Sequence, residues 1–270
     1  MKVVLWIGNG ANQKALANKI GNSFKIEAIV VENTLKQKKS GLAAYIFKVS
    51  SRLFFPVISR SWSELMDHYK KRYPDYPASK LVKVDSINHP HTFALTKSIQ
   101  PDLIIVSGTS LIRTELLNIN PSCGILNLHT GLSPYVKGGP NCTNWCLASG
   151  QLHLIGNTVM WIDKGIDSGD IISTETISFN GNETLYAVHY KVMEHAHSLY
   201  LKVISAVLNK KPVNRVKQAD IGKGTTFFRR NWDLRQQAKL VKNLREFGNL
   251  IKSEEYKSKK KETRTFPLEF

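Results

Sequence analysis

The sequence predicts an α/β protein with an open, doubly wound, mostly parallel sheet, and three observations favour this fold class. Short apolar runs recur up to about Leu208, and several of them end at glycine, which is typical of strands buried on both faces. Stretches with apolar residues at helical spacing alternate with these runs. No internal repeat is visible. Strands that alternate with helices favour a parallel sheet with helices on its faces.

The first elements form one βαβ unit. Residues 2–7 are an apolar run that stops at Gly8, and the turn Gly8-Asn9-Gly10-Ala11-Asn12 follows. Residues 13–20 carry apolar side chains at helical spacing, and residues 24–31 are rich in isoleucine and valine. The order is therefore strand, glycine turn, helix and strand.

Residues 34–80 predict a helical insert. The segment begins as a polar, lysine-rich loop, and residues 42–66 then mix aromatic side chains with Lys and Arg. Pro56 divides this stretch into two amphipathic helices. We expect the resulting hairpin to pack on the core or on a second subunit, with contact to a membrane surface or another partner as the alternative.

The remaining elements follow the same alternation as far as residue 208. Leu103–Ser107 is the clearest buried strand. Further strands are expected at residues 81–84, 125–128, 158–162 and 171–177, and helices at 92–99, 141–148 and 183–208. After Pro212 the composition turns basic, so we divide the chain into a main domain, residues 1–208, and a basic C-terminal extension, residues 209–270.

Composition narrows the class of protein. Of 270 residues, 42% are hydrophobic, which excludes disorder along the whole length. The net charge of +17 favours an anionic partner such as nucleic acid, a phosphorylated substrate or an anionic membrane surface. No apolar run approaches the roughly 18 residues of a membrane span. The N-terminus is too short for a secretory signal, and three cysteines without framework spacing indicate a cytoplasmic protein.

Asn127, His129 and Asp167 are the candidate catalytic residues. Asn127 and His129 are two residues apart at the end of a predicted strand, so their side chains point the same way. Asp167 lies in the loop between two later strands. Ligands of such sheets bind at the carboxyl ends of the strands. Together the three side chains offer an oxyanion donor, a proton-transfer group and a carboxylate to orient it. No Ser or Cys stands beside them with nucleophile spacing, so direct attack by a substrate group is expected.

Ordered motifs around these residues resemble those of the folate-dependent formyltransferases. Asn127-Leu128-His129, then Leu132, Pro134 and Lys137-Gly138, is similar to the family's Asn-x-His, Leu-x-Pro and Gly loop. Residues 101–108 are similar to its preceding strand, and residues 156–160 and 165–171 to its following strand and aspartate loop. The resemblance covers residues 2–31 and 83–208.

The resemblance implies a Rossmann-like catalytic domain that transfers a formyl group from 10-formyltetrahydrofolate to an amine. Asn127 and a protonated His129 would stabilise the oxyanion of the tetrahedral intermediate, and Asp167 would assist proton transfer. The donor pocket is expected at Ser110, Leu111, Ile112, Asp163 and Ile166. No metal site is expected, and Cys142 and Cys146 are interpreted as buried thiols.

The preferred acceptor is a nucleotide-linked amino sugar. Bacterial sugar N-formyltransferases have about this length, a formyltransferase core and a short C-terminal extension, and they imply lipopolysaccharide or O-antigen biosynthesis. The acceptor loop departs from the family's Ser-Leu-Leu-Pro and Arg-Gly pattern, because Lys137 replaces arginine and cannot reproduce its fork. We expect the acceptor to contact Gly8, Asn9, Gly10, Asn12, Tyr135, Lys137, Gly138 and Gly139. A diphosphate and a base would further need side chains of the types supplied by Arg229, Arg230, Phe228 and Trp232.

Other acceptors stay open. Methionyl-tRNA fits the charge, although tRNA-directed members carry a barrel domain for which the residues after Leu208 are too few. Glycinamide ribonucleotide fits the glycine turn at Gly8, although that subfamily has no counterpart of residues 34–80. A hydroxyornithine-type amine is a further alternative, and a homodimer is the expected assembly. A non-enzymatic alternative is a basic nucleic-acid-binding protein on a Rossmann-like scaffold, against which no basic helix or RNA-reading aromatic motif is present.

Overall fold

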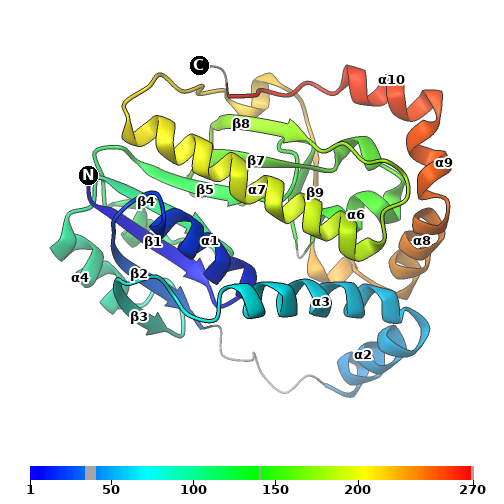
Figure 1. The fold of residues 1–270 in the computed structure, drawn as a ribbon, viewed down its shortest axis with the longest axis horizontal. Coiled ribbons are helices and arrows are strands. Elements are labelled where there is room, and N and C mark those ends of the chain that lie inside the picture. The colour runs from blue at the N-terminus through cyan, green and yellow to red at the C-terminus, as the bar shows by residue number, and fades with distance from the viewer. Residues whose placement is uncertain (34–40, 140, 269–270) are drawn as a thin grey trace.

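The computed structural model describes residues 1–33, 41–139 and 141–268, and these ranges contain a seven-stranded sheet with the order β3-β2-β1-β4-β5-β7-β8 (Figure 1). Its strands are β1 (Val3–Gly8), β2 (Ile26–Glu32), β3 (Lys80–Val84), β4 (Leu103–Ser107), β5 (Ile125–His129), β7 (Gly156–Trp161) and β8 (Ile171–Thr176). The strands from β3 to β5 pair in parallel, whereas β7 pairs antiparallel with both of its neighbours, β5 and β8. The predicted open, mostly parallel sheet is confirmed.

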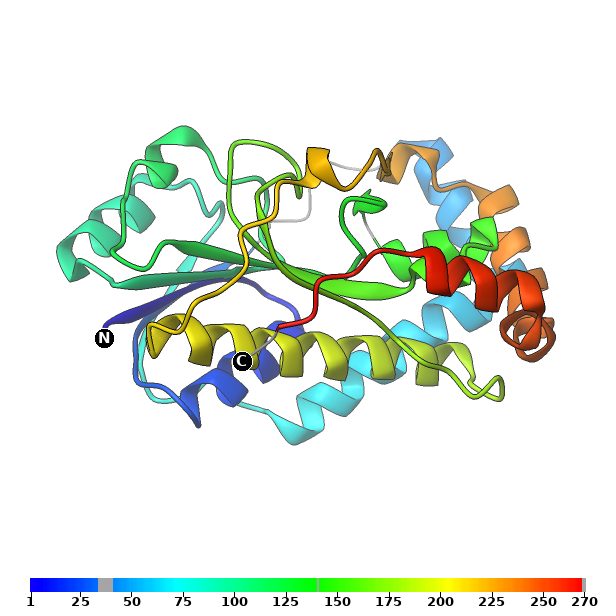
Figure 2. The same ribbon diagram turned by 90° about the horizontal axis from the view of Figure 1, so that it is seen from above.

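Helices cover both faces of the sheet (Figure 2). One face carries α1 (Ala11–Gly21), α3 (Pro56–Arg72) and α7 (Leu185–Leu208), and the other carries α4 (Pro90–Ile99) and α5 (Thr114–Leu117). Strand β1 is buried along its whole length because it contributes side chains to both layers. Leu5 packs with the α1 and α7 side, and Trp6 packs with the α4 side. Burial on both faces explains the unbroken apolar run of this strand.

Tyr200 fixes α7 to the centre of the sheet. Its buried hydroxyl lies 3.1 Å from the amide nitrogen of Val106, 3.0 Å from the carbonyl oxygen of Val106 and 2.8 Å from that of Leu126. The hydroxyl accepts from the amide and donates to a carbonyl, so burial leaves no polar group unpaired there. The contact ties the longest helix to β4 and β5, the two strands that lead to the candidate site.

The insert contains the two predicted helices, but they differ in packing. Helix α3 buries Leu65 and Tyr69 against α1 and α7. Helix α2 (Leu42–Phe54) lies at the edge of the molecule (Figure 1), and most of its apolar side chains are exposed. The expected packing on the core is therefore confirmed for α3. The apolar face of α2 does not pack on the core, so its contact with a second subunit, a membrane surface or another partner stays a prediction. The lysine-rich loop at residues 34–40 lies outside the described residues.

The C-terminal extension folds back onto the end of the sheet that carries β7 and β8. Strand β9 (Thr225–Phe227) pairs in parallel with β6 (Val136–Gly138). Three helices follow, namely α8 (Leu234–Arg245), α9 (Phe247–Lys252) and α10 (Glu254–Glu262). Leu240, Phe247 and Ile251 are buried in one cluster with side chains of α6 (Cys142–Ser149) and α7. Short 3-10 turns occur at Leu152–Leu154, Gln218–Asp220 and Arg229–Asn231.

Within the described ranges, none of the helices combines the length and the apolar character that crossing a membrane requires.

Candidate active site

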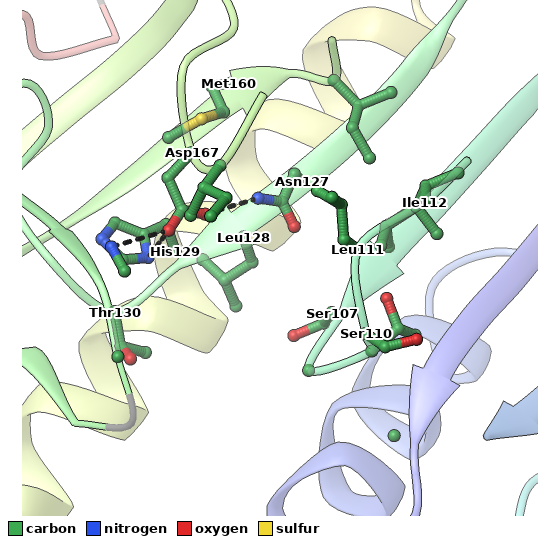
Figure 3. Close-up of a pocket in the computed structure, with 18 of the residues that line it drawn as sticks. Ser107, Ser110, Leu111, Ile112, Asn127, Leu128, His129, Thr130, Met160 and Asp167 are labelled. Carbon is green, nitrogen blue, oxygen red and sulfur yellow. Dashed lines mark hydrogen bonds and ion pairs between the residues drawn. The ribbon is translucent and has the colours of Figure 1, made fainter. Parts of the chain in front are cut away.

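A cavity of about 740 Å³ opens at the carboxyl ends of β1, β4 and β5. The loops after these strands form one wall, and the loop between β7 and β8 forms another. Asn127 and His129 extend from β5, and Asp167 reaches toward them from the β7–β8 loop (Figure 3). This is the edge at which ligands bind in sheets of this kind.

The structure brings the three predicted catalytic side chains together. Asn127 Nδ2 lies 3.4 Å from Asp167 Oδ1, and His129 Nδ1 lies 3.4 Å from Asp167 Oδ2. The dashed lines in Figure 3 mark these contacts. Both separations exceed the roughly 2.7–2.9 Å of a tight charge-assisted hydrogen bond. The three side chains are therefore neighbours without a tight hydrogen bond between them.

Both nitrogens of the His129 ring lie beside acceptors. Nε2 is 3.0 Å from the carbonyl oxygen of Val136, which can only accept, and Nδ1 faces the Asp167 carboxylate. Burial by itself would lower the pKa of His129, but the Asp167 carboxylate, with smaller contributions from Cys142 and the Val136 carbonyl, raises it to about 10. The imidazole is therefore a cation at neutral pH.

Asp167 is held by neighbours from two other segments. The backbone amide of Gly138 on β6 donates to Asp167 Oδ2 at 3.1 Å. Gln218, from the C-terminal extension, donates through Nε2 to the carbonyl oxygens of Asp167 at 2.8 Å and Gly169 at 2.9 Å. Asp167 itself adopts a left-handed φ of 47°. Such a backbone persists where surrounding contacts hold it, and Gln218 supplies two of them.

The five residues predicted for the donor pocket all line the cavity: Ser110, Leu111, Ile112, Asp163 and Ile166. Leu111 and Ile166 expose about half of their apolar surface. Ser110 is fixed by the buried Glu32 carboxylate, which accepts from the Ser110 amide and hydroxyl, both at 2.6 Å, and from the Ile87 amide at 2.9 Å. Sequence reasoning did not single out Glu32, because nothing local marks it as a brace between two loops.

Six of the eight residues predicted for the acceptor line the cavity: Gly8, Asn9, Gly10, Asn12, Gly138 and Gly139. Gly8 has a packing role of its own, because a Cβ there would lie 2.3 Å from the carbonyl oxygen of Gly108. Tyr135 and Lys137 are not among the lining residues. Tyr135 instead meets the C-terminal extension, where its hydroxyl lies 3.2 Å from the amide nitrogen and 3.3 Å from the carbonyl oxygen of Arg264.

The aromatic and cationic candidates of the extension separate into two groups. Phe228 and Arg229 line the cavity. Arg230 does not, and its guanidinium lies over the Phe228 ring at 5.1 Å. Trp232 packs edge-on against Trp145 at 4.8 Å between ring centres, so it is a packing residue.

Trp62 and His197 are among the lining residues that were not expected from the sequence. Trp62 reaches the cavity from α3 and contacts His189 edge-on, with ring centres 5.7 Å apart. His197 of α7 is buried, and its Nδ1 lies 3.2 Å from the Lys19 ammonium, which can only donate. Burial, with a further contribution from Lys19, lowers the pKa of His197 to about 3, so the ring is neutral and carries its proton on Nε2. Both contacts join segments far apart in sequence.

Cys142 and Cys146 are buried thiols, as expected. Over residues 1–33, 41–139 and 141–268, no group of three or more His, Cys, Asp or Glu side chains is arranged to hold a metal ion.

A family model described as Formyl transferase matches residues 57–204, more than half of the chain. The chain belongs to the formyl transferase family. The matched segment contains Asn127, His129 and Asp167, so the predicted family is confirmed on the residues that carry the resemblance. Helix α2 precedes the matched segment.

Curated relatives are similar over part of their length. A methionyl-tRNA formyltransferase of Clostridium perfringens (strain 13) is 32% identical over 123 residues, which are 45% of this chain and 39% of the relative. One of Clostridium botulinum (strain Alaska E43) is 34% identical over 138 residues, 51% of this chain and 42% of the relative. The chain thus matches about two fifths of the length of these relatives.

Solved structures share the fold. An N-formyltransferase of Helicobacter canadensis, in complex with folinic acid and dTDP-3-aminofucose, has a TM-score of 0.56 at 16% identity and covers 90% of this chain and 81% of its own. A 4-N formyltransferase of Francisella tularensis has a TM-score of 0.54 at 19% identity over 90% and 87%. A phosphoribosylglycinamide formyltransferase of Bacillus halodurans has 0.52 at 19% over 78% and 96%.

Proposed function

We propose that this protein is an N-formyltransferase that moves the formyl group of 10-formyltetrahydrofolate to the amine of a nucleotide-linked amino sugar. The observation that carries the proposal is the meeting of Asn127, His129 and Asp167 at the carboxyl edge of the sheet in a formyl transferase fold. Such an acceptor implies a role in cytoplasmic lipopolysaccharide or O-antigen biosynthesis.

The donor end of the cavity has the chemistry to hold a folate. Leu111, Ile112 and Ile166 provide apolar walls for a flat ring system. The Ser110 loop beside them is fixed by Glu32, so the wall is largely preformed, as is usual in small-molecule pockets. The donor supplies an electrophilic formyl carbon, which would sit near Asn127 when the ring occupies this end.

The catalytic residues divide the chemistry between them. The acceptor amine forms a bond to the formyl carbon and loses a proton, while the bond from that carbon to the folate nitrogen breaks and that nitrogen gains one. The Asn127 amide and the His129 cation lie where they can stabilise negative charge on the formyl oxygen, and one such donor is worth about 3 kcal/mol. His129 can give its proton to the departing nitrogen, and the Asp167 carboxylate can take the proton that the amine loses. Transfer of that proton from Asp167 to His129 restores the starting state.

Other residues that line the cavity support a nucleotide-linked acceptor. Trp62 and Phe228 are among them and are each more than one third exposed, and Arg229 adds a cation. An aromatic face suits a base, and arginine pairs with phosphate through a planar fork. The Gly8–Asn12 turn precedes the N-terminus of α1, a position that favours anions. The similar fold of a structure that contains a dTDP-amino sugar is further support.

Methionyl-tRNA is the second candidate acceptor. The curated relatives with 32–34% identity are methionyl-tRNA formyltransferases, and the net charge of +17 suits a nucleic acid. The described part of the extension forms one short strand and three helices after residue 208.

A parallel comparison of acceptors tests the proposal. The purified protein is mixed with 10-formyltetrahydrofolate and, in parallel, with dTDP-, UDP- and GDP-linked amino sugars, glycinamide ribonucleotide, and methionyl-tRNA. We expect tetrahydrofolate release and the mass of one formyl group on a nucleotide sugar, with His129→Ala as the inactive control. Transfer to methionyl-tRNA with none to any nucleotide sugar would overturn the acceptor. Release that His129→Ala leaves unchanged would overturn the site.

A further inference from the structure

Helix α2 presents an apolar stripe to solvent. Five side chains at helical spacing form the stripe, and between 46% and 74% of each is exposed: Leu42, Tyr45, Ile46, Val49 and Leu53. Phe54, at the end of the helix, is 66% exposed. We call the first five residues the α2 stripe. Contiguous exposed apolar patches on soluble proteins mark interaction sites more often than not.

The orientation of α2 is the reverse of a helix that packs on a core. Its inward side is partly polar, since Ser51 Oγ donates to Gln237 Oε1 of α8 at 2.7 Å and Ser50 is half-buried beside it. A helix that packs on its own domain buries its apolar side. Helix α3, which follows α2 directly, buries its apolar side through Leu65 and Tyr69. Packing within this chain therefore accounts for the sequence of α3 and leaves the α2 stripe unexplained.

Cations outnumber carboxylates in the sequence around α2 and on the adjoining helix. No Asp or Glu stands between Glu32 and Glu64 in the sequence, whereas Lys or Arg stands at six positions: Lys36, Lys38, Lys39, Lys48, Arg52 and Arg60. Lys48 and Arg52 are exposed on α2 itself. The adjoining α8 adds the exposed cations Arg235, Lys239, Lys242 and Arg245, none of which forms an ion pair among the described residues. The partner of this surface must therefore be both apolar and anionic.

We propose that α2 docks this protein on the surface of a lipid bilayer that contains anionic lipids. Apolar side chains on one side of a helix and cations beside them are the signature of a helix that lies in the membrane interface. A second copy of the chain would set the same cations against each other, and nucleic acid would leave the apolar stripe in water. A helix of 13 residues is about 20 Å long, shorter than the roughly 30 Å hydrocarbon core, so α2 lies along the surface.

The docking surface is separate from the chemistry. The α2 stripe contributes nothing to the lining of the cavity, and α2 precedes the segment that matches the family model. The proposal therefore does not depend on which acceptor is formylated. Docking through α2 would hold the protein, and with it the cavity, next to a membrane surface.

Vesicle co-sedimentation tests the proposal with the whole 270-residue chain. Vesicles of phosphatidylcholine alone are compared with vesicles that also contain phosphatidylglycerol, at low and high salt. We expect binding to the anionic vesicles that weakens at least tenfold at high salt, and little binding to phosphatidylcholine alone. Attraction by surface cations is screened by salt, whereas insertion of apolar side chains is not.

A matched pair of variants assigns the binding to α2. Leu53→Glu places a charge in the α2 stripe, and Leu81→Glu makes the same change at an exposed leucine of the edge strand β3. We expect Leu53→Glu to reduce vesicle binding at least tenfold and Leu81→Glu to leave it unchanged. Formyl transfer in free solution, which neither residue contacts, reports that both variants are folded.

The outcomes divide cleanly. Absence of binding to anionic vesicles, or equal loss in both variants, overturns the proposal. So does a dimer in sedimentation velocity that Leu53→Glu dissociates while vesicle binding persists, because the stripe would then be a contact between copies. Docking is supported only when anionic lipid, low salt and an intact α2 stripe are all required.

Discussion

Two groups of residues that line the cavity are built differently. Asn127, His129 and Asp167, the reaction group, come from β5 and the β7–β8 loop and receive contacts from β6 and the C-terminal extension. Trp62, Phe228 and Arg229, the selection group, come from the helical insert and from the extension. Each member of the reaction group has a partner within the site, whereas the aromatic side chains of the selection group keep more than a third of their surface exposed.

On the proposed function, the reaction group carries the chemistry and the selection group binds the acceptor. Catalytic groups need a held geometry: Asn127 and His129 stand on β5, and Asp167, on a loop, is held by contacts from β6 and the extension. Groups that choose an acceptor stand on segments outside the sheet, where sequence can vary without disturbing the strands. Changes in the reaction group should therefore lower the rate, and changes in the selection group should alter affinity for the acceptor.

The largest effect is expected at Asp167. Replacement by Asn removes the charge that keeps His129 protonated, and we expect the turnover number to fall about 10²–10⁴-fold. Asp170→Asn is the matched control, because Asp170 lies in the same loop but pairs with Arg215 outside the cavity. Initial rates of tetrahydrofolate release measure both. A similar loss in the two variants would mean that the loop responds to any charge removal.

The pH profile of the reaction examines the same pair of residues, His129 and Asp167. Transfer should decline as the pH rises through about 10, where His129 loses its proton, and not near the ordinary pKa of histidine. Because the folded pKa is raised, the stabilising contribution of the protonated ring is complete below the ordinary pKa and is lost as the pH rises through about 10. In Asp167→Asn the alkaline limb of the residual activity should move to lower pH, since burial then acts without the carboxylate. Rate profiles that overlay would contradict the pairing.

A change at Gln218 tests whether the C-terminal extension supports the catalytic loop. Gln218→Leu removes two hydrogen bonds to the Asp167 loop, and with each worth about 0.5–1.5 kcal/mol we expect roughly a tenfold lower turnover number with unchanged KM. The alkaline limb should also move, because Asp167 shifts from His129. Gln237→Leu is the control, as it is an equally buried glutamine that contacts α2 instead. If both variants lost only thermal stability, Gln218 would be a packing residue.

The smallest effect is expected at Trp62. Truncation to Ala removes an aromatic face worth about 1 kcal/mol, so the KM for the acceptor should rise about fivefold while the turnover number and the KM for the donor hold. Phe54→Ala, an exposed aromatic residue outside the cavity, should change none of these constants. A fall in the turnover number of Trp62→Ala would show that the reaction group and the selection group are not separable.

The features that follow from local pattern were predictable. Apolar runs located the strands, and the spacing of Asn127 and His129 placed them on one side of β5. Contacts between distant segments were not, since nothing near Gln218 or Trp62 in the sequence indicates which loop each will meet. Lys137 was expected to face the acceptor but follows strand alternation, with Gly138 rather than its own side chain toward the cavity. The exposure of the α2 stripe to solvent was not predictable, because amphipathic spacing does not say which side of a helix packs on the protein.

The contact between Gln218 and the Asp167 loop also bears on the order in which the site is completed during synthesis. Asn127, His129 and Asp167 leave the ribosome well before residue 218, and β6 finds its partner β9 only after residue 227 has emerged. A nascent chain that has already made the sheet therefore still lacks two supports of its catalytic loop. The catalytic loop therefore gains its last supports only after residue 227 has emerged.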